Sequence, residues 1–99
     1  MRQKGKKTIM KFVIIGWDGP EAQNKRPIHR PTHLEHLKKL NEQGKLICAG
    51  PFADKTGSLI IIEANSLGEA EAFAREDPYV LEGIFQRTEV HPFKQVIPE

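Results

Sequence analysis

Apolar residues repeat along the chain with two periods, one typical of strands and one typical of helices. Residues 8–16 and 58–64 are rich in β-branched side chains and place apolar residues on both alternating faces, which predicts strands buried on two sides. Residues 46–52 predict a third strand. A last extended run over residues 85–97 contains Pro92, which favours an edge position or a bulge because proline cannot donate a ladder hydrogen bond.

The first helix is predicted to start at Pro31 and to end before Gly44, which suits the left-handed conformation of a C-terminal cap. Leucines spaced three residues apart give this helix its apolar stripe: Leu34, Leu37 and Leu40. His33 precedes Leu37 by four residues, so we expect it in the first turn, near the buried edge of the helix. The preceding residues 17–31 are polar and contain three prolines, which predicts a long loop and a lid over a pocket.

The second helix is predicted to begin at Ser66, with Glu69 three residues later as its capping-box partner. We expect this helix to end at Asp77, because Pro78 disfavours helical backbone at the residue before it. The expected buried stripe of this helix consists of four apolar residues: Leu67, Ala70, Phe73 and Ala74.

The predicted elements follow the order strand, helix, strand, strand, helix, strand, with an antiparallel hairpin around Asp54–Gly57. This order predicts an α+β fold, a ferredoxin-like βαββαβ sandwich with an antiparallel four-stranded sheet. Two helices can cover only one face of such a sheet, and the other face is apolar too. Because exposed apolar patches of that size are uncommon on monomers, we expect a homodimer in which two sheets pack face to face, the dimeric α/β barrel.

The charge pattern argues against a nucleic-acid-binding protein. The 99 residues carry a formal net charge of +2, but four of the 15 basic side chains lie in the first seven residues, which leaves 11 basic and 13 acidic residues in 8–99. Residues 1–9 are predicted to form a basic, disordered tail, and residues 10–97 a single domain. No apolar run is long enough to cross a membrane and no secretory signal is recognised, so we expect a cytoplasmic protein without a membrane or nucleic-acid partner.

Neither the cysteine nor the histidines form a recognisable metal site. Cys48 is the single cysteine, which excludes an internal disulfide, and its apolar strand predicts a buried, unreactive thiol. His29, His33 and His36 follow an HxxxHxxH spacing, but the last two are three residues apart rather than four. Since no nearby cysteine completes the set, no metal is expected.

Four short motifs follow one another along the chain: RPTHL at residues 30–34, GKLICAGPF at 44–52, DPYV at 77–80 and HPFKQV at 91–96. In this order the motifs make residues 10–96 resemble the YciI-like (YCII-related) family of the dimeric α/β-barrel superfamily. The resemblance implies a His–Asp pair in a pocket of each subunit as the proposed active site. By motif, this pair corresponds to His33 and Asp77, and it requires no cofactor.

A carboxylate bonded to one imidazole nitrogen fixes the tautomer of the ring and raises the basicity of the other nitrogen. The family includes a dehydrochlorinase of chlorinated hydroxyquinol breakdown, and its fold is similar to that of muconolactone isomerases. The resemblance therefore implies general acid/base chemistry, of the lyase (dehydrochlorinase) or isomerase type, on a small carbonyl or enol substrate. Four further residues are expected to bind the substrate: Arg30, Gly50, Pro51 and Tyr79.

The same residues allow other interpretations. In a purely structural one, Asp77 caps backbone amides near the helix end and His33 completes a buried polar network. In another, the protein is a non-catalytic module that binds a small metabolite in the same cleft. A cofactor-independent oxygenase is a third alternative, and no residue argues for it.

Overall fold

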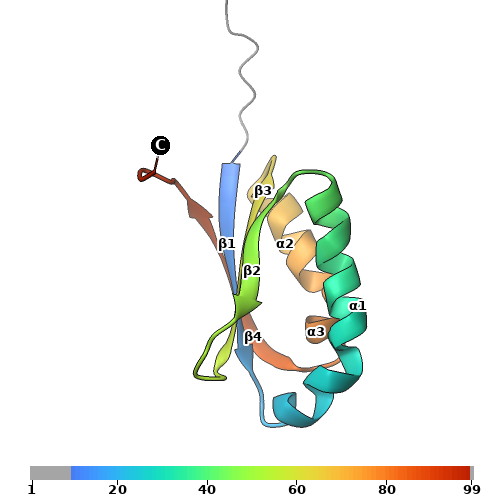
Figure 1. The fold of residues 1–99 in the computed structure, drawn as a ribbon. Coiled ribbons are helices and arrows are strands. Elements are labelled where there is room, and N and C mark those ends of the chain that lie inside the picture. The colour runs from blue at the N-terminus through green and yellow to red at the C-terminus, as the bar shows by residue number, and fades with distance from the viewer. Residues whose placement is uncertain (1–9, 99) are drawn as a thin grey trace, which may run out of the picture.

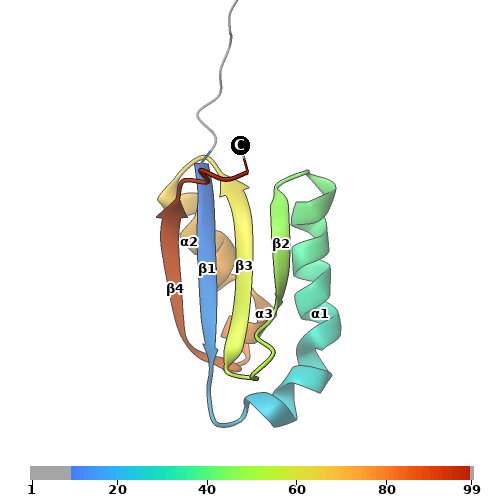
Figure 2. The ribbon, with the colours of Figure 1, turned by 60° about the vertical axis from the view of Figure 1, so that its left-hand side comes forward.

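The computed structural model describes residues 10–98, so the predicted tail, residues 1–9, lies outside the described residues. The elements follow one another in this order: β1 (Met10–Asp18), α1 (Ala22–Glu42), β2 (Leu46–Pro51), β3 (Gly57–Ala64), α2 (Leu67–Arg75), α3 (Pro78–Leu81) and β4 (Phe85–Phe93). The four strands form an antiparallel sheet in the order β2-β3-β1-β4 (Figure 2). This is the predicted ferredoxin-like arrangement, with a short third helix added, and Pro92 lies in an edge strand as predicted.

All three helices lie along one face of the sheet (Figure 1). In the central strands Phe12 of β1 pairs with Ile62 of β3, and both side chains are buried beneath the helices. The core between the sheet and the helices consists of apolar side chains from both layers: Phe12, Ile14, Leu37, Ile60, Ile62, Ala64, Ala70 and Ala74. Burial of each large side chain contributes about 1.5–3 kcal/mol, which holds α1 and α2 on the sheet. None of the helices within residues 10–98 is long and apolar enough to cross a bilayer.

Helix α1 starts at Ala22 rather than at Pro31, so the prediction of a loop and lid over residues 17–31 is wrong for most of that segment. Prolines favour a loop, but here Pro27 and Pro31 both lie inside the helix. Each removes one backbone hydrogen bond and displaces a carbonyl, and the first turns of α1 run at an angle to the rest (Figure 2). Burial of Ala22 against α3 and β4 offsets part of that cost. Gly44 adopts a left-handed conformation after the helix, as predicted.

Helix α2 has the predicted cap. The Oγ of Ser66 accepts a hydrogen bond from the backbone of Glu69, whose carboxylate accepts one from the backbone of Asn65. The prediction of a buried stripe is correct for the two alanines, which are buried, whereas Phe73 is only half-buried. For Leu67 the prediction of burial is wrong, because its side chain is 40% exposed. Leu67 is the first residue of the helix, where the chain has only just left the end of the sheet. After α2, a single helical turn, α3, occupies part of the segment between residues 77 and 85, for which no element was predicted.

The second face of the sheet has no helix over it in residues 10–98 (Figure 1). On this face Val13 and Ile15 of β1 are half-buried, as are Leu59 and Ile61 of β3. The prediction that these two strands are buried on both sides is therefore wrong for a single chain. The prediction of a buried thiol is also wrong, because Cys48 lies in the edge strand β2 and is exposed.

Face-to-face pairing of two chains remains a prediction, and light scattering at micromolar concentration tests it. A mass of one chain would contradict it.

Glu89 of β4 is the centre of a polar network on this open face. Its carboxylate accepts hydrogen bonds from His91 at 3.0 Å, from the indole of Trp17 and from Arg87 at 2.6 Å. These bonds, His91 first, lower the pKa of Glu89 from its ordinary 4.5 to about 2. Because the pKa is lower in the folded state, the carboxylate stabilises the fold above pH 4.5, and this contribution is lost as the pH falls to about 2.

We expect a carboxyl ¹³C NMR titration to give Glu89 a midpoint near 2, with the indole N–H shift of Trp17 changing over the same range. Glu71, an exposed carboxylate of α2, provides the comparison within the same spectra. Coincident midpoints for the two carboxyl groups would show that the network does not form.

Candidate active site

His33 and Asp77 form a buried pair between α1 and the start of α3. The Nδ1 of His33 lies 2.7 Å from Oδ1 of Asp77, and the two residues are only 7% and 2% exposed. A carboxylate can only accept a hydrogen bond, so Nδ1 carries the proton of this bond. In a neutral ring Nε2 is then unprotonated, which is the form of a general base. No residue in the range 10–98 supplies a hydrogen bond to this Nε2.

Local backbone structure fixes the position of Asp77. It is the N-cap of α3, and its Oδ1 accepts the backbone N–H of Tyr79 at 2.9 Å. Pro78 follows at the first helical position, where its missing N–H costs nothing. The oxygen that caps the helix is therefore the same oxygen that bonds to His33. Capping and pairing occur together, so the structural role of Asp77 does not exclude the pair.

Tyr79 holds the imidazole from one side. Its ring stacks on that of His33 with centroids 3.8 Å apart and planes 3° from parallel, and Phe85 packs edge-on against it. Burial raises the pKa of the Tyr79 phenol and is the largest effect, whereas the charges of Arg26 and Arg30 act to lower it. The phenol therefore stays protonated near neutral pH and can donate a hydrogen bond.

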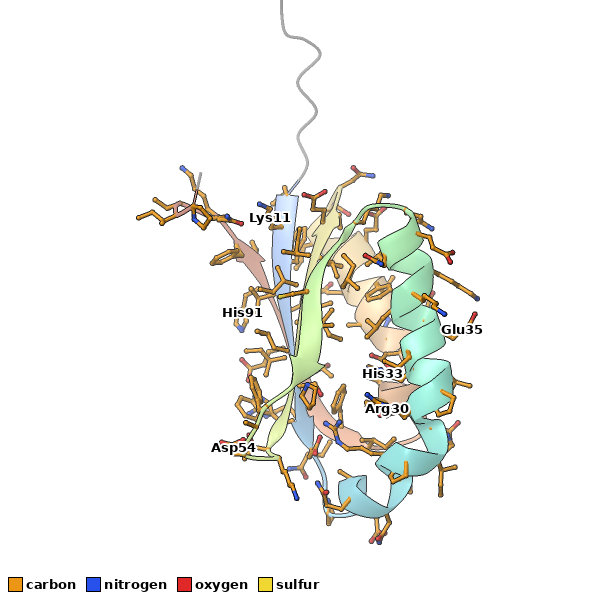
Figure 3. All side chains as sticks on the ribbon, in the orientation of Figure 1. Lys11, Arg30, His33, Glu35, Asp54 and His91 are labelled. Carbon is orange, nitrogen blue, oxygen red and sulfur yellow. The ribbon has the colours of Figure 1, made fainter. Side chains whose placement is uncertain are left out.

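The imidazole of His33 lines a cavity of about 130 Å³ between α1 and the end of the β2–β3 pair. Five of the six predicted site residues line this cavity: Arg30, His33, Gly50, Pro51 and Tyr79. The sixth, Asp77, holds His33 by hydrogen bonding without lining the cavity. In Figure 3, Arg30 and His33 lie on the side of α1 that faces the sheet, whereas Glu35 lies on the opposite side. The structure thus brings all six predicted residues into one region.

A second hollow, of about 480 Å³, adjoins the first and extends to the turn between β2 and β3. Four residues line both spaces: Arg26, Arg30, Pro51 and Tyr79. The outer volume is within the range of about 300–1,000 Å³ typical of small-molecule sites. The inner cavity has room for a ligand of roughly one six-membered ring.

Three further polar residues belong to the site, and the sequence analysis missed them. Arg26 donates from Nε and Nη2 to the carboxylate of Asp18, at 3.0 and 2.7 Å, and from Nη2 to Oγ of Ser58 at 3.0 Å. Arg26, Arg30 and His33 are spaced four and three residues apart, so they share one face of α1. The spacing of these three residues can be read from the sequence, but it indicates a shared helix face only if residues 22–31 are helical.

The other histidines of α1 make separate contacts. His29 lies 3.8 Å from a carboxylate oxygen of Glu82. The Nε2 of His36 donates to the backbone carbonyl of Phe73 at 3.0 Å, and the two rings stack. Within residues 10–98, no group of three or more His, Cys, Asp or Glu side chains is placed to hold a metal ion.

Comparison with known proteins gives matches along most of the chain. A family model described as the YCII-related domain matches residues 10–94. Protein YciI of Escherichia coli O6:H1 is 39% identical over 97 residues, which covers 88% of this chain and 99% of that protein. An uncharacterized protein of Haemophilus influenzae is 36% identical with the same coverage.

A solved structure is similar to this chain in both fold and sequence. It is 5-chloro-2-hydroxyhydroquinone dehydrochlorinase (TftG) from Burkholderia phenoliruptrix AC1100, in complex with 2,5-dihydroxybenzoquinone. Its TM-score is 0.78 at 31% identity, and the match covers 88% of this chain and 96% of that one. A second structure, Rv0793 from Mycobacterium tuberculosis, is similar in fold alone, with a TM-score of 0.56 at 12% identity.

Proposed function

Because the chain belongs to the YCII-related family, we propose that it is a lyase-type enzyme in which His33 moves a proton on a small carbonyl or enol substrate. One observation carries this proposal: the imidazole lines a cavity while its Nδ1 is bonded, at 2.7 Å, to a buried carboxylate. A ring held in this way is fixed in one tautomer. Its other nitrogen is available to accept a proton.

In the proposed reaction Nε2 of His33 removes a proton from the substrate, and the carboxylate of Asp77 stabilises the imidazolium that forms. Tyr79 lines the cavity and remains protonated, so its phenol is suited to donate a hydrogen bond to a substrate oxygen. The same imidazolium then returns a proton to carbon. These steps require proton transfer only, which the side chains of the site supply.

The dehydrochlorinase TftG suggests a substrate class for a first test. Loss of HCl from a chlorinated hydroxyquinol replaces the C–Cl bond by C–H, removes two hydroxyl protons and leaves a hydroxyquinone. The ring is oxidised as the carbon–chlorine bond is reduced, so no external oxidant enters. Proton removal from oxygen and proton delivery to carbon are both acid/base steps.

We would incubate the full chain with 5-chloro-2-hydroxyhydroquinone without oxygen and measure chloride release together with quinone absorbance. A set of chlorinated lactones would be assayed in parallel. The proposal predicts product from at least one compound, with a rate proportional to protein concentration. Thermal stabilisation by these compounds without any product would contradict it and favour the binding-module alternative.

A further inference from the structure

Two arginines of α1 offer unused N–H donors to the cavity of His33. The Nε and Nη2 of Arg26 are bonded to Asp18 and Ser58, whereas its Nη1 has only a weaker neighbour, the phenol oxygen of Tyr79, whose pKa the guanidinium helps to lower. Arg30, one turn later, makes no hydrogen bond or ion pair with any residue in 10–98. Both side chains line the inner cavity and the outer hollow. The two guanidinium groups therefore have donors left for a ligand.

The charge around these spaces is unbalanced. Asp18 neutralises Arg26, and Asp77 is bonded to His33, but Arg30 and Lys55 have no carboxylate within ion-pair distance among the described residues. No acidic side chain lines either space. Walls of one charge with little solvent between them raise the local concentration of ligands of opposite charge. The cavity therefore favours an anion.

The guanidinium of Arg26 is also held in place. It is fixed by three hydrogen bonds and lies 5.1 Å from the centre of the Tyr79 ring, which also stacks on His33. The charges of Arg26 and Arg30 both act to lower the pKa of Tyr79, so both guanidinium groups lie near enough to stabilise negative charge on the phenol oxygen. A fixed guanidinium loses little side-chain entropy when it binds a ligand.

We infer that the substrate binds as a planar oxyanion, its charge shared by two oxygens, held by Arg30 together with Nη1 of Arg26. This inference rests on the proposed function, because it names the substrate class of the same site. A carboxylate and an ionised hydroxyquinone both have this chemistry, and the guanidinium fork matches two oxygens in one plane. His33 then acts on the part of the substrate next to the bound anion.

Calorimetric titration of the full chain tests this inference without turnover. The anionic probes are 2,5-dihydroxybenzoquinone and benzoate, and their neutral counterparts are 2,5-dimethoxybenzoquinone and benzamide. The quinones are titrated into Cys48→Ser, because the exposed thiol would add to them. Arg30→Gln removes the charge of interest, and Arg75→Gln, an exposed arginine of α2, is the matched control.

We expect at least one anion to bind more tightly than its neutral counterpart, and Arg30→Gln to weaken that anion about 10- to 100-fold, as for loss of a charge-assisted hydrogen bond. Arg75→Gln should change the affinity less than twofold. The probe that binds better identifies the kind of oxyanion. Equal affinity for charged and neutral probes, equal effects of the two variants, or no anion binding at millimolar concentration would each overturn the inference.

The result is separable from the proposed function. Anion binding that depends on Arg30, with turnover indifferent to His33, would sustain the inference and refute the proposed function. Turnover that depends on His33, with equal affinity for charged and neutral probes, would do the reverse.

Discussion

Replacement of His33 by glutamine should lower kcat by about 10²- to 10⁴-fold while the chain remains folded. The glutamine amide is polar and of similar reach, but it takes up no proton near neutral pH. The stacking on Tyr79 is lost in part, so a modest loss of stability should accompany the loss of activity. Chloride release in the assay above gives kcat, and circular dichroism gives the folded fraction.

The control for this variant is His36→Gln. His36 is also a histidine of α1 and also stacks on an aromatic ring, but it bonds the carbonyl of Phe73 and does not line the cavity of His33. Its replacement should leave kcat unchanged. If both variants reduced kcat equally, or if His33→Gln lost activity only by unfolding, His33 would have no part in proton transfer.

Asp77→Ala should cause the largest loss of stability among the site variants, about 2–4 kcal/mol. The substitution removes the cap of α3, worth about 1 kcal/mol, and leaves the buried Nδ1–H of His33 without a partner, at a cost of about 1–3 kcal/mol. Urea unfolding followed by fluorescence of Trp17 measures the free energy of unfolding. The slope of the unfolding free energy against urea concentration should equal that of the wild type.

Asp77→Asn separates the charge of this residue from its shape. An asparagine oxygen can accept from both Tyr79 and His33, as the carboxylate does through its single Oδ1, so most of the stability should remain. The neutral amide cannot stabilise an imidazolium, so kcat should still fall. Equal destabilisation by alanine and asparagine would contradict the shared-oxygen geometry.

Local sequence patterns were sufficient to predict most of the sheet and part of the helical layer. The strands follow from β-branched runs bounded by turns, and the start of α2 follows from Ser66 and Glu69, because these signals act over a few residues. Asp77 and Pro78 carry a similar signal for α3, a capping residue before a proline, which could have predicted that helix too.

The site itself could not be predicted from local patterns. His33 and Asp77 are 44 residues apart, and only the family motifs indicated that they meet. The prolines of residues 22–31 concealed the first turns of α1, and with them the helical spacing that places Arg26 beside Arg30. Ser58 looked like an ordinary strand residue, because its contact with Arg26 depends on how α1 packs on the sheet.

The proposed proton transfer depends on Asp77, which fixes the tautomer of His33 and leaves its Nε2 unprotonated. Imidazole ¹⁵N NMR of the full chain, at a pH where the rings are neutral, tests this directly. His36 is an internal reference with the opposite tautomer, because its Nε2 must carry the proton that it donates to the carbonyl of Phe73. We predict a proton on Nδ1 of His33 and on Nε2 of His36. A proton on Nε2 of His33, or rapid exchange between its two tautomers, would contradict the account.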